Sequence, residues 1–128
     1  MWLATRYGFY SVVCAHDDLL QDRSHPSLMM IRARKHDHLA KLRELHPELP
    51  GIKESAGTDY PYRIIANRDM VMAVVRGLVD EIDYTNFKNA AHEELPEDGA
   101  YISFLHSVWG LGLRITPPRV RKGGPTVE

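Results

Sequence analysis

Apolar residues recur at steps of three and four along residues 67–82, and this is the clearest pattern in the chain. The apolar positions are Val71, Val74, Val75, Leu78 and Ile82. This spacing places the side chains on one side of an α-helix, where they can cover a hydrophobic core. Asn67 or Asp69 is expected to cap the start of the helix. The pattern therefore predicts a long amphipathic helix that packs against a sheet.

Three other segments have the composition of β-strands. They are residues 2–14, which are rich in aromatic and β-branched side chains, residues 28–34, and residues 60–66. Alternation along the first segment places Phe9, Ser11 and Val13 on one face and Tyr10, Val12 and Cys14 on the other. The polar residues 15–27 are expected to form the loop that joins the first two strands into an antiparallel hairpin.

Two further helices complete the predicted order. Residues 35–46 carry leucines at helical spacing after a potential N-cap, Asp37, and residues 100–113 form an apolar helix. The order β-β-α-β-α-α predicts an α+β fold, a small and mainly antiparallel sheet with helices packed on one face. Residues 1–114 are expected to form this single domain, and residues 115–128 a flexible basic tail.

The composition narrows the class of protein. The 128 residues are 44% hydrophobic and 26% charged, which fits one globular domain with a real core. A net charge of −1 gives no general attraction to nucleic acid or acidic membranes, so such binding would need a local patch. A lone Cys14, no signal-peptide pattern and no long apolar run favour a cytoplasmic protein without a membrane partner.

Arginines gather on the predicted sheet. Arg32 and Arg34 alternate along the second strand and so share a face, and Arg63 lies in the third strand beside Tyr62. A guanidinium group suits phosphate and carboxylate, and an aromatic ring can stack on a base. These residues are a candidate anion-binding surface. The alternative is a solvated face whose arginines pair with Asp or Glu.

Polar and aromatic side chains are concentrated in the segment IDYTNFK, at the end of the long helix. The candidate ligand-binding residues there are Asp83, Tyr84, Asn86 and Lys88. The alternative is a structural junction, in which Asn86 ends the helix and Tyr84 and Phe87 fill the edge of the core. In that case the charged groups are expected to join Arg32 and Arg63 in an internal polar network.

The sequence carries no recognisable catalytic or metal motif. Its seven histidines include no HExxH pattern, and it contains no P-loop, GxGxxG or GxSxG motif. We therefore expect no metal site and no cofactor. His106 lies in an otherwise apolar helix and is a candidate for ligand binding or for acid-base chemistry. The alternative for His106 is a hydrogen-bonded structural role.

Four blocks of sequence, MWLATRYGFYSVV, TDYPYR, EIDYTNFK and HSVW, occur in this order within residues 1–109. In these blocks the chain resembles a family of small, uncharacterised bacterial and bacteriophage proteins with MWxxTRxGFYSVV and IDYxNFK segments. The resemblance implies a cytoplasmic protein encoded by a bacterium or a bacteriophage. It implies no reaction and no ligand.

These observations lead to three hypotheses of function. The first is a non-enzymatic binding or regulatory protein that acts on a host or cellular protein. The second is a nucleic-acid or nucleotide-binding domain that uses Arg32, Arg34, Tyr62, Arg63 and Lys88. The third is a small hydrolase or transferase with Asp83 or His106 as general acid or base, which requires a concave pocket between the IDYTNFK segment and the last helix.

Overall fold

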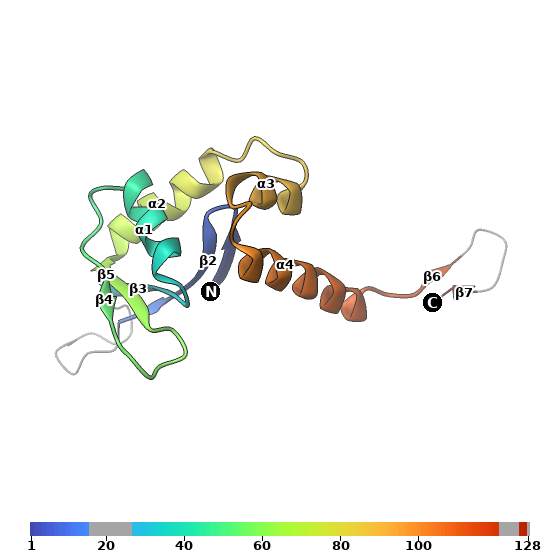
Figure 1. Ribbon diagram of the computed structural model, residues 1–128, viewed down its shortest axis with the longest axis horizontal. Coiled ribbons are helices and arrows are strands. Elements are labelled where there is room, and N and C mark those ends of the chain that lie inside the picture. Colours follow the sequence, from blue (N-terminus) through green and yellow to red (C-terminus); the bar gives the residue numbers. More distant parts are fainter. Residues whose placement is uncertain (16–26, 121–125, 128) are drawn as a thin grey trace.

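The computed structural model describes residues 1–15, 27–120 and 126–127 of the chain. A five-stranded antiparallel sheet, with helices packed against it, forms the body of the molecule (Figure 1). Its strands are β1 (Trp2–Thr5), β2 (Gly8–Cys14), β3 (Leu28–Ala33), β4 (Lys53–Glu54) and β5 (Tyr62–Asn67). The helices are α1 (His36–Leu45), α2 (Arg68–Asp80), α3 (Phe87–Glu94) and α4 (Gly99–Gly112). The predicted α+β fold is confirmed.

The sheet has the strand order β1-β2-β3-β5-β4. The first predicted strand is in fact two strands, β1 and β2, which form a tight hairpin around Arg6 and Tyr7. Pairing of β2 with β3 is antiparallel, as predicted, and the predicted loop falls mostly on residues 16–26, outside the described residues. The register places Ser11 opposite Arg32, and Arg32 opposite Arg63, so these side chains share one face of the sheet.

The main core lies between the opposite face of the sheet and helices α1 and α2. The sheet contributes Tyr10, Val12, Ile31, Ala33, Ile64 and Ala66, and the helices contribute Leu39, Leu42, Val71, Val74 and Leu78. Full burial of one large apolar side chain stabilises a protein by about 1.5–3 kcal/mol. The apolar stripe of the long helix therefore fixes α2 on the sheet, as the sequence pattern indicates.

The ends of the helices differ from the predictions in three places. Asn67 caps α2 as expected, since its Oδ1 accepts from the Met70 N–H at 2.8 Å. However, α2 ends at Asp80, so Ile82 lies beyond the helix and is 51% exposed. The N-cap position of α1 is Lys35, and Asp37 lies in the first turn. Asn86 begins α3 and does not end α2, because its Oδ1 accepts from the Asn89 N–H at 3.0 Å.

A second, smaller core joins α3 and α4 to the first residues of β2. Ala91, Tyr101 and Leu105 are buried there, and Phe9 and Phe87 pack against them. Beyond Leu105, α4 projects away from the sheet (Figure 1). It continues into a 3-10 turn, η1 (Leu113–Ile115), and then into β6 (Arg119–Val120), which pairs with β7 (Thr126–Val127). The prediction of a flexible tail falls largely on residues 121–125 and 128, which lie outside the described residues.

Candidate functional site

Asp98 joins the start of α4 to α1. Its Oδ1 accepts from Lys35 Nζ at 2.8 Å and from the Tyr101 N–H at 3.2 Å, so the same oxygen also caps α4. Its Oδ2 lies 2.9 Å from His38 Nε2. Burial raises the pKa of Asp98, but the hydrogen bonds from Lys35, His38 and the Tyr101 N–H outweigh burial and lower it. Asp98 is therefore ionised at neutral pH and anchors α4.

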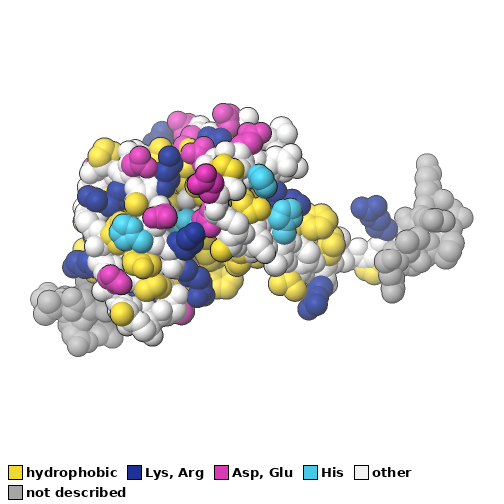
Figure 2. Space-filling model, viewed as in Figure 1, with side chains coloured by type: hydrophobic (Ala, Val, Ile, Leu, Met, Phe, Trp, Pro, Cys, Tyr) yellow, Lys and Arg dark blue, Asp and Glu magenta, His cyan; other side chains and the backbone are white. Residues whose placement is uncertain are grey.

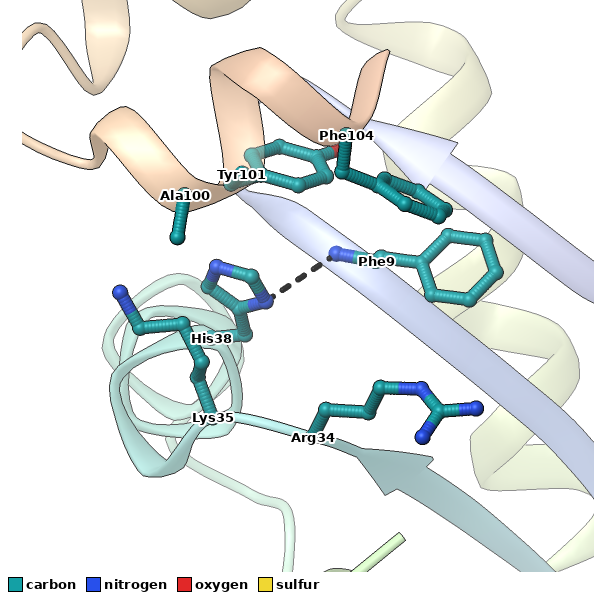
Figure 3. Close-up of a pocket in the computed structure, with 7 residues that line it drawn as sticks. All are labelled: Phe9, Arg34, Lys35, His38, Ala100, Tyr101 and Phe104. Atoms are coloured by element: carbon teal, nitrogen blue, oxygen red, sulfur yellow. Dashed lines mark hydrogen bonds between the residues drawn. The ribbon is translucent and has the colours of Figure 1, made fainter. Parts of the chain in front are cut away.

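Both ring nitrogens of His38 have protein partners, and Figure 3 shows the contact with Phe9. The Phe9 N–H donates to Nδ1 at 3.3 Å, which leaves the ring proton on Nε2, where it is donated to Asp98. Burial lowers the pKa of His38 in spite of the neighbouring carboxylate. Because both nitrogens have protein partners, this neutral histidine holds β2, α1 and α4 together and has no free nitrogen for acid-base chemistry.

Gly8 makes the close approach of His38 possible. Gly8 has a φ of 153°, and a Cβ at this position would overlap the imidazole ring. Any other side chain would therefore push His38 off the end of β2. The hydroxyl of Tyr101 donates to the Thr5 carbonyl at 2.6 Å and closes the same junction from the side of α4.

Two cavities border this junction. The first measures about 190 Å³ and lies between β2, α1 and α4 (Figure 3). Its lining consists of Phe9, Arg34, Lys35, His38, Ala100, Tyr101 and Phe104. The second measures about 410 Å³, is more polar, and lies between α1 and the segment that joins α3 to α4. Pockets for small organic ligands usually measure about 300–1,000 Å³, so the first cavity has room for one ring only.

The IDYTNFK residues are used in separate intramolecular contacts. Asp83 Oδ1 accepts from Arg6 Nη1 at 2.9 Å, and the Tyr84 ring centre lies 5.4 Å from Arg6 Cζ. Asn86 caps α3, and Lys88 Nζ lies 4.3 Å above the Trp109 ring of α4. These four side chains do not converge on one point. They correspond to the structural alternative only in part, because Arg6 takes the place expected for Arg32 and Arg63, and Asn86 begins α3 instead of ending α2.

None of the cavities described here joins Asp83 and His106. Asp83 binds Arg6 at the surface, and His106 is exposed on α4. Neither residue lines the two cavities described above or a third of about 140 Å³ near Arg6. The arrangement required by the hydrolase or transferase hypothesis is therefore not formed by these cavities.

Three arginines gather around one tyrosine on the face of the sheet that α1 and α2 leave uncovered. Arg32 Cζ and Arg34 Cζ each lie 4.6 Å from the centre of the Tyr60 ring. Arg63 Nη2 donates to the Tyr60 carbonyl at 3.2 Å. Tyr62, which the sequence favoured as the aromatic partner, lies on the opposite face, where its ring contacts His36. The alternation of side chains along β5 could have shown that Tyr62 and Arg63 point apart.

These arginines lack the carboxylate partners that the helical side of the molecule provides. Arg6 pairs with Glu81 and Asp83, and Lys35 pairs with Asp98. Arg32, Arg34 and Arg63 form no ion pair with any described residue, and the buried Nε atoms of Arg32 and Arg63 have no hydrogen-bond partner there. The predicted alternative of arginines neutralised by Asp or Glu is therefore not found in the described part of the chain.

The outer part of α4 exposes large apolar side chains, and we call residues 104–115 the α4 arm. The exposed residues are Phe104, Val108, Trp109, Leu111, Leu113 and Ile115, with exposed fractions from 39% to 88%. Figure 2 shows hydrophobic side chains along this projection. At about 180 Å² for each large side chain, they expose roughly 600 Å² of apolar surface, which is as large as the largest patch on a typical monomer.

Two further properties concern the described residues only. No helix in them is long and apolar enough to cross a bilayer. No three of their histidine, cysteine, aspartate or glutamate side chains lie close enough together to hold a metal ion.

Comparison with known proteins gives no relative: no family model, no curated protein and no solved structure matches the chain. Any assignment of function must therefore start from the surfaces described above. The resemblance in the MWLATRYGFYSVV and IDYTNFK segments stays an expectation from the sequence.

Proposed function

We propose that this protein is a small non-enzymatic binding protein that docks onto a host or cellular protein through the α4 arm. The observation that carries the proposal is that every large apolar side chain of the α4 arm beyond Leu105 is exposed. A helix that is apolar all round is normally buried. Since the domain covers only its first two turns, a partner is needed to cover the rest.

Charge indicates the chemistry of the partner. The sequence from Gly99 to Arg119 contains no Asp or Glu, while His106, Arg114 and Arg119 carry or can carry positive charge. Two copies of such an arm would repel each other weakly, whereas an apolar groove bordered by carboxylates would attract it. The roughly 600 Å² of apolar surface approaches the ~800 Å² that each partner buries in a stable complex. The partner is thus a protein with an apolar groove and an acidic rim.

A photo-crosslinking residue at position 111 tests the proposal. In a lysate of the producing bacterium it should capture one protein, while the same residue at position 72, exposed on α2, should not capture it. The captured protein is then purified and its affinity measured directly. Trp109→Asp/Leu111→Asp should weaken the complex about 30-fold or more, because it places charge in the centre of an apolar interface. Val79→Asp, an exposed position on α2, is the matched control.

Three results would overturn the proposal. One is unchanged affinity of the purified partner for the Trp109→Asp/Leu111→Asp variant while circular dichroism shows a folded protein. Another is crosslinking of position 111 to a second copy together with a dimer in sedimentation, which would assign the arm to self-association. The third is binding of the arm to lipid vesicles without any protein partner.

A further inference from the structure

We propose that the sheet face with three arginines that form no ion pair with any described residue binds single-stranded nucleic acid. The basic sheet face is defined by Trp2, Phe9, Ser11, Arg32, Arg34, Lys53, Tyr60 and Arg63. It lies apart from the outer half of the α4 arm, and the proposal does not depend on the function proposed above.

The register of the sheet lines up the polar side chains of this face. Trp2 lies opposite Ser11, Ser11 opposite Arg32, Arg32 opposite Arg63, and Arg63 opposite Lys53. One row therefore crosses all five strands, with an aromatic ring at one edge and a lysine at the other. Neighbouring strands lie about 4.8 Å apart, so the row is long enough for several nucleotides.

The arginines are held in place without loss of charge. Arg34 Nη1 donates to the Asp59 carbonyl at 2.9 Å, Arg63 donates to the Tyr60 carbonyl, and Arg32 Nη2 donates to Ser11 Oγ at 2.8 Å. All these acceptors are neutral, and the Tyr60 ring is neutral too. Each guanidinium group has five N–H donors. The Nε–H groups of Arg32 and Arg63 are buried, so a ligand would be bound by the remaining Nη donors of the three arginines. Fixed and uncompensated positive charge favours a phosphate-bearing ligand.

Aromatic rings continue the face beyond the arginines. Trp2 is 72% exposed, its ring centre lies 5.9 Å from that of Phe9, and Phe9 lies 5.0 Å from Phe104. Rings beside a cationic groove are the arrangement that proteins use to stack the bases of single strands. The 190 Å³ cavity between Phe9, Phe104 and Arg34 accepts one ring and is too small to enclose a whole nucleotide. The geometry thus favours a strand lying across the face over a free nucleotide.

The net charge of −1 does not oppose this assignment. Among the described residues, the carboxylates of Glu81, Asp83 and Asp98 pair with cations on the helical side, while the Asp59 carboxylate, next to Tyr60, forms no ion pair with the arginines of the sheet face. In Figure 2 acidic side chains gather over the upper part of the view, around α2 and α3. The basic sheet face thus keeps the local positive charge that a protein without net positive charge needs.

Binding of fluorescent 12-nucleotide oligo(dT) and oligo(U), followed by anisotropy at several salt concentrations, tests the proposal with the full-length protein. We expect affinity to fall with salt with a logarithmic slope of about −2, the value for three phosphate contacts on a single strand. Trp2 fluorescence in a Trp109→Phe background should be quenched on binding. The DNA and RNA arms show which of the two nucleic acids this site prefers.

Variants separate this site from general attraction. Arg34→Gln changes an exposed side chain and should keep the fold, and Arg32→Gln/Arg34→Gln should weaken binding tenfold or more and reduce the slope. Trp2→Ala should weaken binding at least fivefold through loss of stacking. Arg76→Gln, on the exposed side of α2, is the matched control and should change little. Trp109→Asp/Leu111→Asp should also leave this binding unchanged, which separates it from docking through the arm.

Clear results would refute the inference. Absence of binding at low salt by the folded protein would do so, and so would equal losses in Arg76→Gln and Arg32→Gln/Arg34→Gln. Equal affinity for double-stranded DNA would show attraction by charge alone. Equal competition by inorganic phosphate or by a mononucleotide would assign the arginines to a simple anion site and remove the single strand from the proposal.

Discussion

Replacement of Asp98 by alanine removes a carboxylate that receives hydrogen bonds from Lys35 and His38, at the start of α1, and also caps α4. Three stabilising contributions are lost together. An N-cap contributes about 1 kcal/mol. The Nε2–H of His38, whose side chain is only 5% exposed, is left without an acceptor, which costs about 1–3 kcal/mol. The ion pair with Lys35 adds little, because the lysine side chain is 42% exposed.

The expected loss is therefore about 2–4 kcal/mol of the free energy of unfolding, against a total of 5–15 kcal/mol for a domain of ordinary stability. Urea denaturation followed by circular dichroism measures it directly, and the melting temperature should fall by on the order of 10 °C. Asp98→Asn retains an oxygen for the cap and should lie between the alanine variant and the native protein.

The matched control is Glu97→Ala, which removes an exposed neighbouring carboxylate that has no hydrogen bond or ion pair among the described residues. It should change stability by less than ~0.5 kcal/mol. A loss of less than ~0.5 kcal/mol in Asp98→Ala would refute the view that Asp98 anchors α4. A similar loss in both variants would refute it too, because general charge and not the hydrogen bonds would then be responsible.

Three further perturbations follow from the same contacts. Gly8→Ala should lower the free energy of unfolding, measured by urea denaturation, by about 2–4 kcal/mol, because its Cβ would overlap the His38 ring at a φ of 153°. Gly51→Ala, which has open space around it, should be nearly neutral. Equal effects of the two substitutions would contradict the overlap. Burial lowers the pKa of His38 from its ordinary 6.5, so as the pH falls the unfolded chain takes up the proton before the folded protein does. The free energy of unfolding should therefore decrease as the pH drops below about 6.5. The His38→Gln variant should lack this part of the pH dependence. Arg6→Met should lower the free energy of unfolding by about 1–2 kcal/mol, because it leaves several hydrogen-bond acceptors unpaired. Asp83→Asn should lower it by less than ~1 kcal/mol, because the Asp83 side chain is 77% exposed. If thermal melts showed Asp83→Asn to be the more destabilising of the two, the result would contradict the junction described.

Elements with a repeating pattern could be predicted from the sequence, and their ends could not. The apolar stripe of α2 and the hairpin of β2 and β3 follow from periodicity and chain order. The break between β1 and β2 falls at Arg6 and Tyr7, where Thr5 Oγ1 accepts from the Tyr7 N–H and donates to the Gly8 carbonyl. The aromatic and β-branched composition of residues 2–14 does not indicate this turn. Ile82 fitted the helical period, yet α2 stops before it.

The candidate surfaces show the same division. Arg32, Arg34 and Arg63 could be placed on one face by the period of two along a strand. Tyr60 could not, because it lies in a loop and reaches the arginines only through the fold. Asp98 and Lys35 are 63 residues apart, and Asp98 looked like part of a polar break before the last helix. Long-range pairing of this kind leaves no trace in composition or spacing.

The long separation between His38 and Asp98 also sets a time during synthesis. The two partners are 60 positions apart in the sequence, and a ribosome adds about 5–20 residues each second, so roughly 3–12 s pass between them. Throughout that interval Phe9 of β2 and the His38 ring of α1 lack the cover of α4. The end of the sheet at Thr5 waits longer still for the hydroxyl of Tyr101, 96 residues away. This junction therefore forms among the last steps of folding during synthesis. Until it forms, chaperones that recognise exposed apolar surface can bind the nascent chain.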